Sequence, residues 1–127
     1  MSTQRDIIDY GLRRRAVLVD LACGRRSRAE VCDAHPYLLL AARHYGEPSG
    51  ASCPVCDGSG HRVVHYVYGD CLGRSAGQAK SSAELALLAA AAAEFTVYVV
   101  EVCIDCGWNH LARAFALGCV DHAGAGR

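Results

Sequence analysis

Two short stretches, SCPVCDGSGH (residues 52–61) and VCIDCGWNH (residues 102–110), decide how this 127-residue chain is expected to fold. Each contains a Cys-x-x-Cys pair with a glycine close behind the second cysteine. Such a turn places two thiolates on one side of a tetrahedron, and its backbone N–H groups point at the sulfurs. Two turns together supply the four soft ligands of a structural zinc site. The sequence therefore predicts that zinc is bound by Cys53, Cys56, Cys103 and Cys106.

Strand-like segments flank both pairs. The segments RVVHYVYG (62–69) and FTVYVVEV (95–102) are rich in β-branched and aromatic residues. The second of them is apolar on both faces, which predicts a central strand. Large residues alternate with alanine over 108–118, and we interpret this segment as a third strand. Strands that enter and leave cysteine turns are typical of a zinc ribbon.

The two cysteine pairs are unusually far apart for a zinc ribbon. Between Cys56 and Cys103 lie 46 residues, whereas compact ribbons use roughly 15–20. The surplus reads as a loop (69–81) followed by a helix (82–93), which begins at a capping box formed by Ser81 and Glu84. We expect this insertion to cover one face of the sheet.

The first part of the chain has helical patterns. Apolar residues recur at helical spacing over 5–22. Ser27 and Glu30 form a capping box, which predicts a short helix at about 28–34. Pro36 suits the first position of a further helix that ends at Gly46.

The stretch GEPSGAS (46–52) interrupts these patterns, and we place a boundary there. The predicted parts are a helical N-terminal segment (1–48) and a zinc-ribbon-like domain (49–127) with an inserted loop and helix. The expected fold class is α+β. In this prediction the N-terminal helices pack on an antiparallel sheet of about three strands.

Bulk charge gives no argument for nucleic acid or an anionic membrane, because the formal net charge is zero. Arginines are nevertheless clustered near the N-terminus. The candidates for contact with nucleic acid phosphates or a partner protein are Arg13, Arg14, Arg15, Arg25, Arg26 and Arg28. The alternative is that they form a solvated helix face and a solvated loop.

The location of the protein bears on its eight cysteines. The N-terminus lacks the apolar core of a signal peptide, and the most apolar run, ELALLAAAAAEF (84–95), is too short to span a bilayer. We expect a cytoplasmic protein, in which this many cysteines indicates metal binding or reduced thiols rather than disulfides.

Redox activity of the two pairs is the main alternative to metal binding. A thioredoxin-like pair lies at a junction between a strand and a helix. Neither pair here is followed by a helical pattern, so we favour a closed structural site. Four cysteines also leave no position for a catalytic water.

The other cysteines and histidines carry weaker signals. Cys119 and His122 could bind a second metal with Cys71 or His65, but we interpret them as tail residues without such a partner. The remaining assignments are small core residues for Cys23 and Cys32, sheet-face residues for His65 and His110, and a hydrogen bond to a cysteine sulfur for His61.

A family resemblance rests on six stretches between residues 5 and 118. They are DYGLRRR, EVCDAHPYLLLAARHYGEPS, CPVC, VYGDCLG, EFTVYVVEVC and WNHL. With these, the chain resembles an actinobacterial family of short, zinc-ribbon-like proteins classed as a domain of unknown function. The resemblance implies a cytosolic bacterial protein and supplies no activity.

No catalytic set is recognisable, and we expect a protein that is not an enzyme. The leading hypothesis is a zinc-binding adaptor or accessory factor that associates with a transcription or translation machine. The alternative is a DNA-binding regulator that uses the N-terminal helices. A third hypothesis, an enzyme using Cys71 or the glycine-rich loop YGDCLGRSAG (68–77), has the least support.

Overall fold

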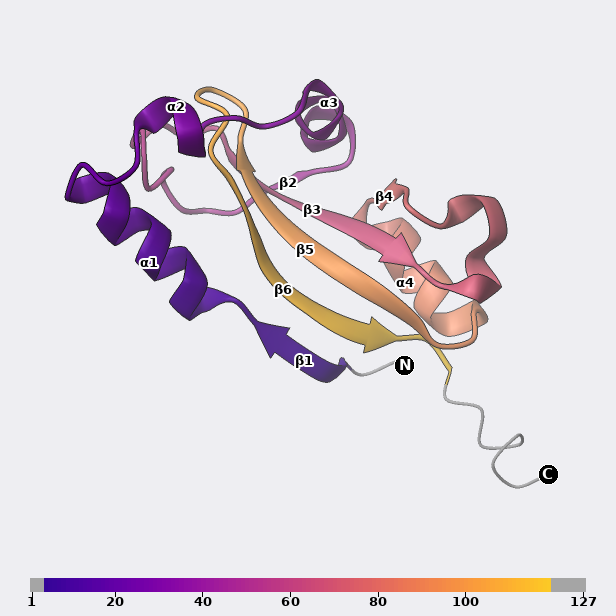
Figure 1. The fold of residues 1–127 in the computed structure, drawn as a ribbon. Coiled ribbons are helices and arrows are strands. Elements are labelled where there is room, and N and C mark those ends of the chain that lie inside the picture. Colours follow the sequence, from indigo (N-terminus) through magenta and orange to yellow (C-terminus); the bar gives the residue numbers. More distant parts are fainter. Residues whose placement is uncertain (1–3, 120–127) are drawn as a thin grey trace.

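The computed structural model describes residues 4–119, and their elements alternate between short helices and strands (Figure 1). In chain order they are β1 (Arg5–Asp9), α1 (Gly11–Ala22), α2 (Arg28–Val31), α3 (Pro36–His44), β2 (Glu47–Pro48), β3 (His61–Tyr68), the 3₁₀ helix η1 (Asp70–Ser75), β4 (Ala79–Lys80), α4 (Ser82–Ala91), β5 (Phe95–Cys103) and β6 (Asn109–Leu117).

One antiparallel sheet organises the molecule. Its order is β1-β6-β5-β3-β2, and β4 also pairs with β3, so the sheet has six strands. The prediction of about three strands is therefore wrong, although the class remains α+β. The three long strands were expected. The additional strands lie at the margins of the sheet; β1 has five residues, and β2 and β4 have two each. Strands of two residues show no alternation in the sequence.

The prediction of a helix from residue 5 is also wrong, because residues 5–9 form β1. This strand pairs with β6, with Ile8 opposite Ala114, and the N–H of Tyr10 donates to the carbonyl of Ala112 at 3.0 Å. The carboxylate of Asp9 then accepts from the N–H of Gly11 at 2.6 Å, at the start of α1. Pairing with a sheet edge thus overrides the helical spacing of Ile8.

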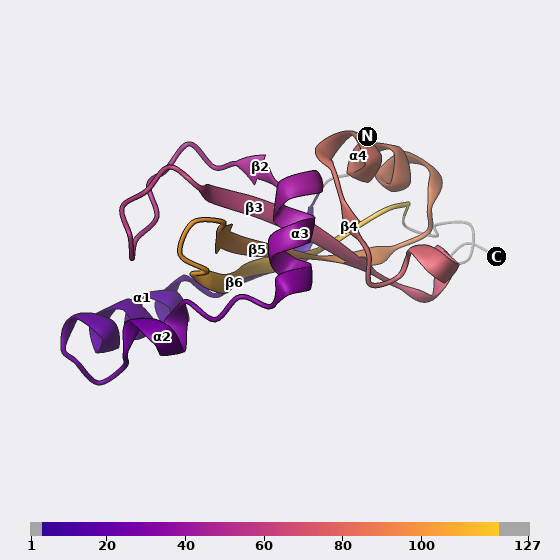
Figure 2. The same cartoon turned by 90° about the horizontal axis from the view of Figure 1, so that it is seen from above.

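Helices cover both faces of the sheet. Alternate residues of a strand point to opposite faces. Val67 and Val97 pack in a cluster with residues of α4, whereas Val64 and Val102 pack with Ala42 of α3. The inserted helix α4 and the N-terminal helix α3 therefore lie on opposite faces. In the view from above, α3 crosses the strands on the near side and α4 lies apart from it, beyond β4 (Figure 2).

The N-terminal elements join the later ones through this sheet. β1 pairs with β6 and β2 with β3, so both predicted parts contribute strands to one sheet. The boundary near residue 48 stays a prediction. Of the helices in residues 4–119, none has the length and apolar character needed to cross a membrane.

Candidate metal centre

The four predicted ligands meet at one end of the sheet. The sulfur atoms of Cys53, Cys56, Cys103 and Cys106 all lie within 4.8 Å of one another. The Cys53 and Cys106 sulfurs are 3.7 Å apart, and the Cys56 and Cys103 sulfurs 3.6 Å. Four thiolates at the usual Zn–S distance of about 2.3 Å lie roughly 3.8 Å apart. The spacing of the sulfurs therefore fits one tetrahedral metal ion.

Strand pairing brings the two cysteine turns together. His61 at the start of β3 is opposite Cys103 at the end of β5, and the N–H of Ile104 donates to the carbonyl of Gly60 at 3.0 Å. Within the second turn, Cys103 and Trp108 are joined by a backbone hydrogen bond of 2.8 Å. After the 46 residues between the pairs, the second cysteine pair thus lies beside the first.

Backbone N–H groups point at the sulfurs in both turns. The N–H of Val55 lies 3.4 Å from the Cys53 sulfur, and the N–H of Trp108 lies 3.4 Å from the Cys106 sulfur. The N–H of Gly58 makes the same contact with Cys56 at 3.4 Å. Such donors offset the negative charge of thiolates and favour them as metal ligands.

Burial makes three of the four thiols hard to ionise without a metal. It raises the pKa of Cys53 and of Cys103, and it raises the pKa of Cys106 to about 12. The pKa of Cys56 is instead lowered, mainly by the hydrogen bond from Gly58. A metal ion that binds here must displace protons from the buried thiols.

A buried carboxylate lies beside the four-cysteine cluster. Glu101, on β5, is only 6% exposed. Its carboxylate accepts hydrogen bonds from Arg14 Nε at 2.7 Å and from Trp108 Nε1 at 2.7 Å, and it lies 3.1 Å from His61 Nε2. Glu101 thus connects α1, β3 and the second cysteine turn. The one acid inside the apolar segment 95–102 was the available signal for it.

The charge on Glu101 is stabilised by its donors. Burial alone would raise the pKa of this carboxyl, but the hydrogen bonds from Arg14, Trp108 and His61, with the charge of Arg14, lower it overall. The prediction that His61 contacts a cysteine sulfur is wrong. Its Nε2 faces Glu101, and its Nδ1 lies 2.6 Å from the hydroxyl of Ser49.

A fifth cysteine lies against the centre. The thiol of Cys32, at the end of α2, lies 3.6 Å from the Cys106 sulfur. The prediction of a core position is wrong for Cys23, which is exposed, whereas Cys32 is half-buried and packs against the core cluster that contains Val31 and Trp108. No spacing pattern in the sequence relates Cys32 to the two pairs.

The chain around Cys32 is fixed to the second cysteine turn. The N–H of Ala34 donates to the carbonyl of Gly107 at 3.0 Å, and the amide of Asn109 donates to Asp33 at 3.0 Å. Gly107 has a φ of +88°, and a Cβ there would lie 2.9 Å from the carbonyl oxygen of Cys32. Glycine is therefore required at this contact.

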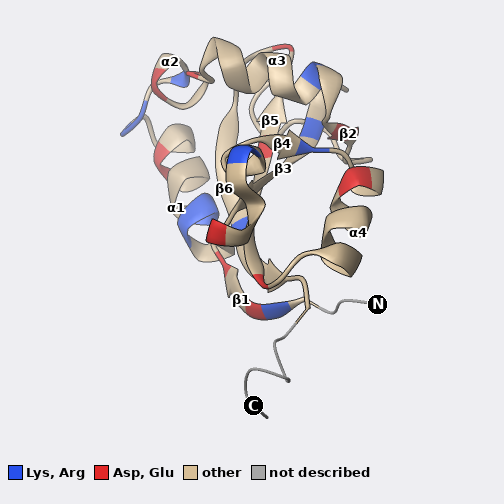
Figure 3. Cartoon of the chain, turned by 90° about the vertical axis from the view of Figure 1, so that its right-hand side faces the viewer, with Lys and Arg blue, Asp and Glu red and all other residues tan. Residues whose placement is uncertain are grey.

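The candidate arginines have different surroundings. Arg14 pairs with Glu101, while Arg25 and Arg26 lie 2.8 Å and 3.5 Å from the carboxylate of Asp20. The basic segments of α1 and the α1–α2 connection lie on the side of the molecule away from α4 (Figure 3). Contact of the six arginines with a partner stays a prediction.

The remaining cysteines lie apart from the cluster. The Cys71 thiol lies 3.5 Å from the carbonyl oxygen of Ala93, and the Cys119 thiol lies 3.6 Å from that of Ala90. His122, considered as a ligand of a second metal, is outside the described residues. Over residues 4–119 the four-cysteine group is the one cluster suited to hold a metal.

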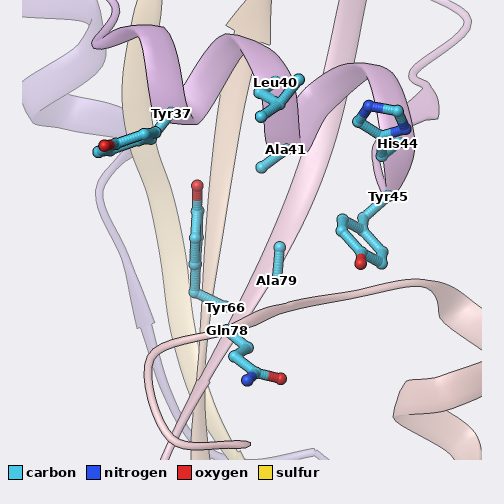
Figure 4. Close-up of a pocket in the computed structure, with 8 residues that line it drawn as sticks. All are labelled: Tyr37, Leu40, Ala41, His44, Tyr45, Tyr66, Gln78 and Ala79. Carbon is cyan, nitrogen blue, oxygen red and sulfur yellow. The ribbon is translucent and has the colours of Figure 1, made fainter.

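Tyrosines line a concave surface between α3 and the sheet. One cavity, of about 570 Å³, is bounded by Tyr37, Leu40 and Tyr45 from α3 and its end and by Tyr66 from β3 (Figure 4). A second, of about 490 Å³, shares Tyr66. We call the tyrosines of these two cavities the tyrosine surface; they are Tyr37, Tyr45, Tyr66, Tyr68 and Tyr98.

Comparison with known proteins places the chain in a family. Residues 1–127 match the model of the "Family of unknown function (DUF5318)", and the chain belongs to this family. It is 48% identical over 111 residues to uncharacterized proteins of Mycobacterium tuberculosis and Mycobacterium bovis, covering 87% of this chain and 81% of theirs. No solved structure matches the chain. The expected resemblance to an actinobacterial family is confirmed.

Proposed function

We propose that this member of the DUF5318 family is a non-enzymatic adaptor whose fold is held by one zinc ion. Its partner in this proposal is a protein or ribonucleoprotein complex of the transcription or translation machinery in the cytoplasm. The observation that carries the proposal is the four-sulfur cluster, with all four sulfurs within 4.8 Å of one another.

The chemistry of the cluster supports zinc in a structural role. Thiolate ligands in a tetrahedral arrangement suit zinc, and a four-cysteine site leaves no open position for a substrate or a catalytic water. Cys53 and Cys103 are 2% and 0% exposed. The ion would join the ends of β3 and β5 and stabilise the turn on which residues 32–34 rest. Such a site contributes directly to folding.

The tyrosine surface supports a protein partner. Tyr37 is 77% exposed and Leu40 52%. Tyrosine is enriched in the energetically important parts of protein interfaces. Except for His44, the residues that line the two cavities carry no ionisable group other than tyrosine. An uncharged aromatic surface is suited to a protein segment rather than to a phosphate backbone.

The DNA-binding alternative has less support from the helices. A recognition helix needs a free polar face. α2 has four residues, and the exposed positions of α3 include the large hydrophobic residues Tyr37 and Leu40. If the protein nevertheless binds DNA through its arginines, affinity should fall steeply with salt and with Arg13 and Arg15 changed to alanine.

The first test measures the metal. Native mass spectrometry of the full chain should show one zinc ion per chain. A strong chelator should remove this ion, and the metal-free chain should no longer unfold cooperatively on heating. A metal-free chain that unfolds cooperatively at the same temperature would overturn the zinc part of the proposal.

The second test concerns the partner. Tagged protein is purified from its own cells, with nuclease treatment in a parallel arm, and the captured proteins are identified. Wild type should capture subunits of one machine, and Tyr37→Ala with Leu40→Ala should lose them. Leu87→Ala is the matched control, since Leu87 is 72% exposed on α4. Equal capture by all variants would argue against the tyrosine surface, and recovery of DNA alone would argue against the adaptor role.

A further inference from the structure

The metal centre has one thiol more than a tetrahedral ion uses. Cys106 lies between two other sulfurs, with Cys53 at 3.7 Å and Cys32 at 3.6 Å. Cys53 belongs to the group of four that could surround an ion, whereas Cys32 does not. Cys32 therefore remains a free thiol when the ion is bound, although it is as close to Cys106 as the ligands are to one another.

We propose that Cys32 and Cys106 form a peroxide-reactive thiol pair, in which oxidation joins the two sulfurs and removes Cys106 from the metal. The reactant is a hydroperoxide, with hydrogen peroxide as the simplest case. The inference rests on the zinc site of the proposed function. It assigns to the fifth cysteine a chemical role that the structural site alone does not require.

The location of the two sulfurs favours this reaction. Cys32, Cys56 and Cys106 are half-buried, whereas Cys53 and Cys103 are buried, so a small oxidant reaches Cys56 and Cys106 more easily than the inner ligands. Cys106 is the one of these two that has the Cys32 thiol beside it, at 3.6 Å. A disulfide needs an S–S distance of about 2.05 Å, so the two sulfurs must approach by roughly 1.5 Å. Cys32 is the residue at which α2 ends. Because the backbone of residues 32–34 is held to the second turn, this approach falls on the side-chain torsions of the two cysteines.

The reaction balances in two steps. The Cys106 thiolate attacks one oxygen of hydrogen peroxide; an S–O bond forms, the O–O bond breaks, and hydroxide leaves and takes up a proton from solvent. The Cys32 sulfur then attacks the Cys106 sulfur; an S–S bond forms, the S–O bond breaks, and hydroxide leaves with the Cys32 proton as water. Two thiol groups are oxidised and one peroxide is reduced to two waters.

The reaction changes both the metal site, which contains Cys106, and the N-terminal segment, which contains Cys32. The metal keeps three cysteines, which weakens its binding. The N-terminal segment, already hydrogen-bonded to the second turn through Ala34 and Gly107, becomes covalently fixed to it. Because Cys32 acts as the resolving thiol, it also protects Cys106 from irreversible oxidation to sulfinic acid.

Tryptic peptides identify the bond unambiguously. Cys32 is the one cysteine of peptide 29–43, Cys53 and Cys56 share peptide 44–62, and Cys103 and Cys106 share peptide 81–113. The zinc-loaded full chain is treated with one equivalent of hydrogen peroxide, and released zinc is followed with a chromogenic chelator. Free thiols are then alkylated, and the peptides are analysed by mass spectrometry.

The expected result is zinc release with a link between peptides 29–43 and 81–113, located at Cys106 by fragmentation. A link between 44–62 and 81–113, or zinc release while Cys32 is still alkylated, would overturn the proposal. If the untreated protein holds no zinc, the proposed structural zinc site is refuted. The presence or absence of the link between peptides 29–43 and 81–113 then still tests whether Cys32 and Cys106 form a disulfide.

Two variants separate the chemistry from general damage, and both are treated with two or more equivalents of peroxide, because sulfinic acid needs one equivalent for each oxygen. Cys32→Ser should bind zinc normally before oxidation, but after this treatment its Cys106 should gain about 32 Da as sulfinic acid, and dithiothreitol should not restore zinc binding. Cys23→Ser changes an exposed cysteine of the same segment and should recover as the wild type does. Full recovery of Cys32→Ser after reduction would contradict the resolving role.

Discussion

Replacing Glu101 with glutamine tests whether the buried carboxylate joins helix α1 to the end of the sheet that carries the four cysteines. Gln has nearly the same shape but carries two donors and one acceptor at its end. In the wild type, Arg14 and Trp108 each donate to a different oxygen of Glu101 at 2.7 Å. Whichever way the amide is turned, one of these donors then faces an N–H group.

The magnitude follows from the hydrogen bonds that are lost. A bond to a charged group contributes about 1.5–3 kcal/mol, and a donor left unsatisfied adds to the loss. We expect Glu101→Gln to lower the free energy of unfolding by about 2–4 kcal/mol. For a chain of 127 residues, this corresponds to a fall in Tm of about 8–15 °C.

The assay is thermal unfolding of zinc-loaded protein between pH 5 and 8, with zinc content measured for each variant. Because the pKa of Glu101 is lowered in the folded state, its contribution is present above the unfolded pKa and is lost only as pH falls through the lowered value. The difference between wild type and variant should therefore be constant over this range. Glu94→Gln is the control, since Glu94 is exposed.

Two results would refute the reasoning. One is a fall in Tm of less than about 2 °C, equal to that of the control. The other is that the losses of unfolding free energy caused by Glu101→Gln and Arg14→Met add fully in the double variant. Two residues of one ion pair should instead show a coupling energy.

Three further outcomes are expected. Cys103→Ser should abolish zinc binding in native mass spectrometry and cooperative unfolding with it, whereas Cys71→Ser should do neither. Zinc affinity, measured by competition with a chelator, should weaken as pH falls from about 8 to 6, because burial raises the pKa of Cys106 to about 12 and the ion must displace its proton; a flat profile would contradict this. Gly107→Ala should cost roughly 1 kcal/mol more than Gly24→Ala in denaturant titration, since both have positive φ but only Gly107 lies against another segment.

The clustering of the four cysteines was predictable because each cysteine pair carries its own geometry. A Cys-x-x-Cys turn fixes two sulfurs locally, and strand-like neighbours indicated how two turns could meet. Cys32 gave no such signal. Its position depends on the path of the chain between α2 and α3, and that path is set by contacts with the second turn that no local pattern encodes.

The fold was predictable where strands are long and buried. The segments of β3, β5 and β6 contain enough residues for composition and alternation to identify them. β1 was not predictable, because four of its five residues are exposed and their spacing also suits a helix. Its strand conformation comes from the free edge of β6, which is visible only after the sheet has formed.

The pairing of β1 with β6 has a consequence for how the protein is made. The first strand of the described chain needs the last one as its neighbour, and Cys53 needs Cys103 and Cys106 to complete a site. While the ribosome is still synthesising the middle of the chain, neither the sheet nor the metal centre can close. Such long-range contacts make folding slow. The apolar strand β5 therefore emerges before β6 is available to cover its edge, and we expect this edge to be open to pairing with other chains during that interval.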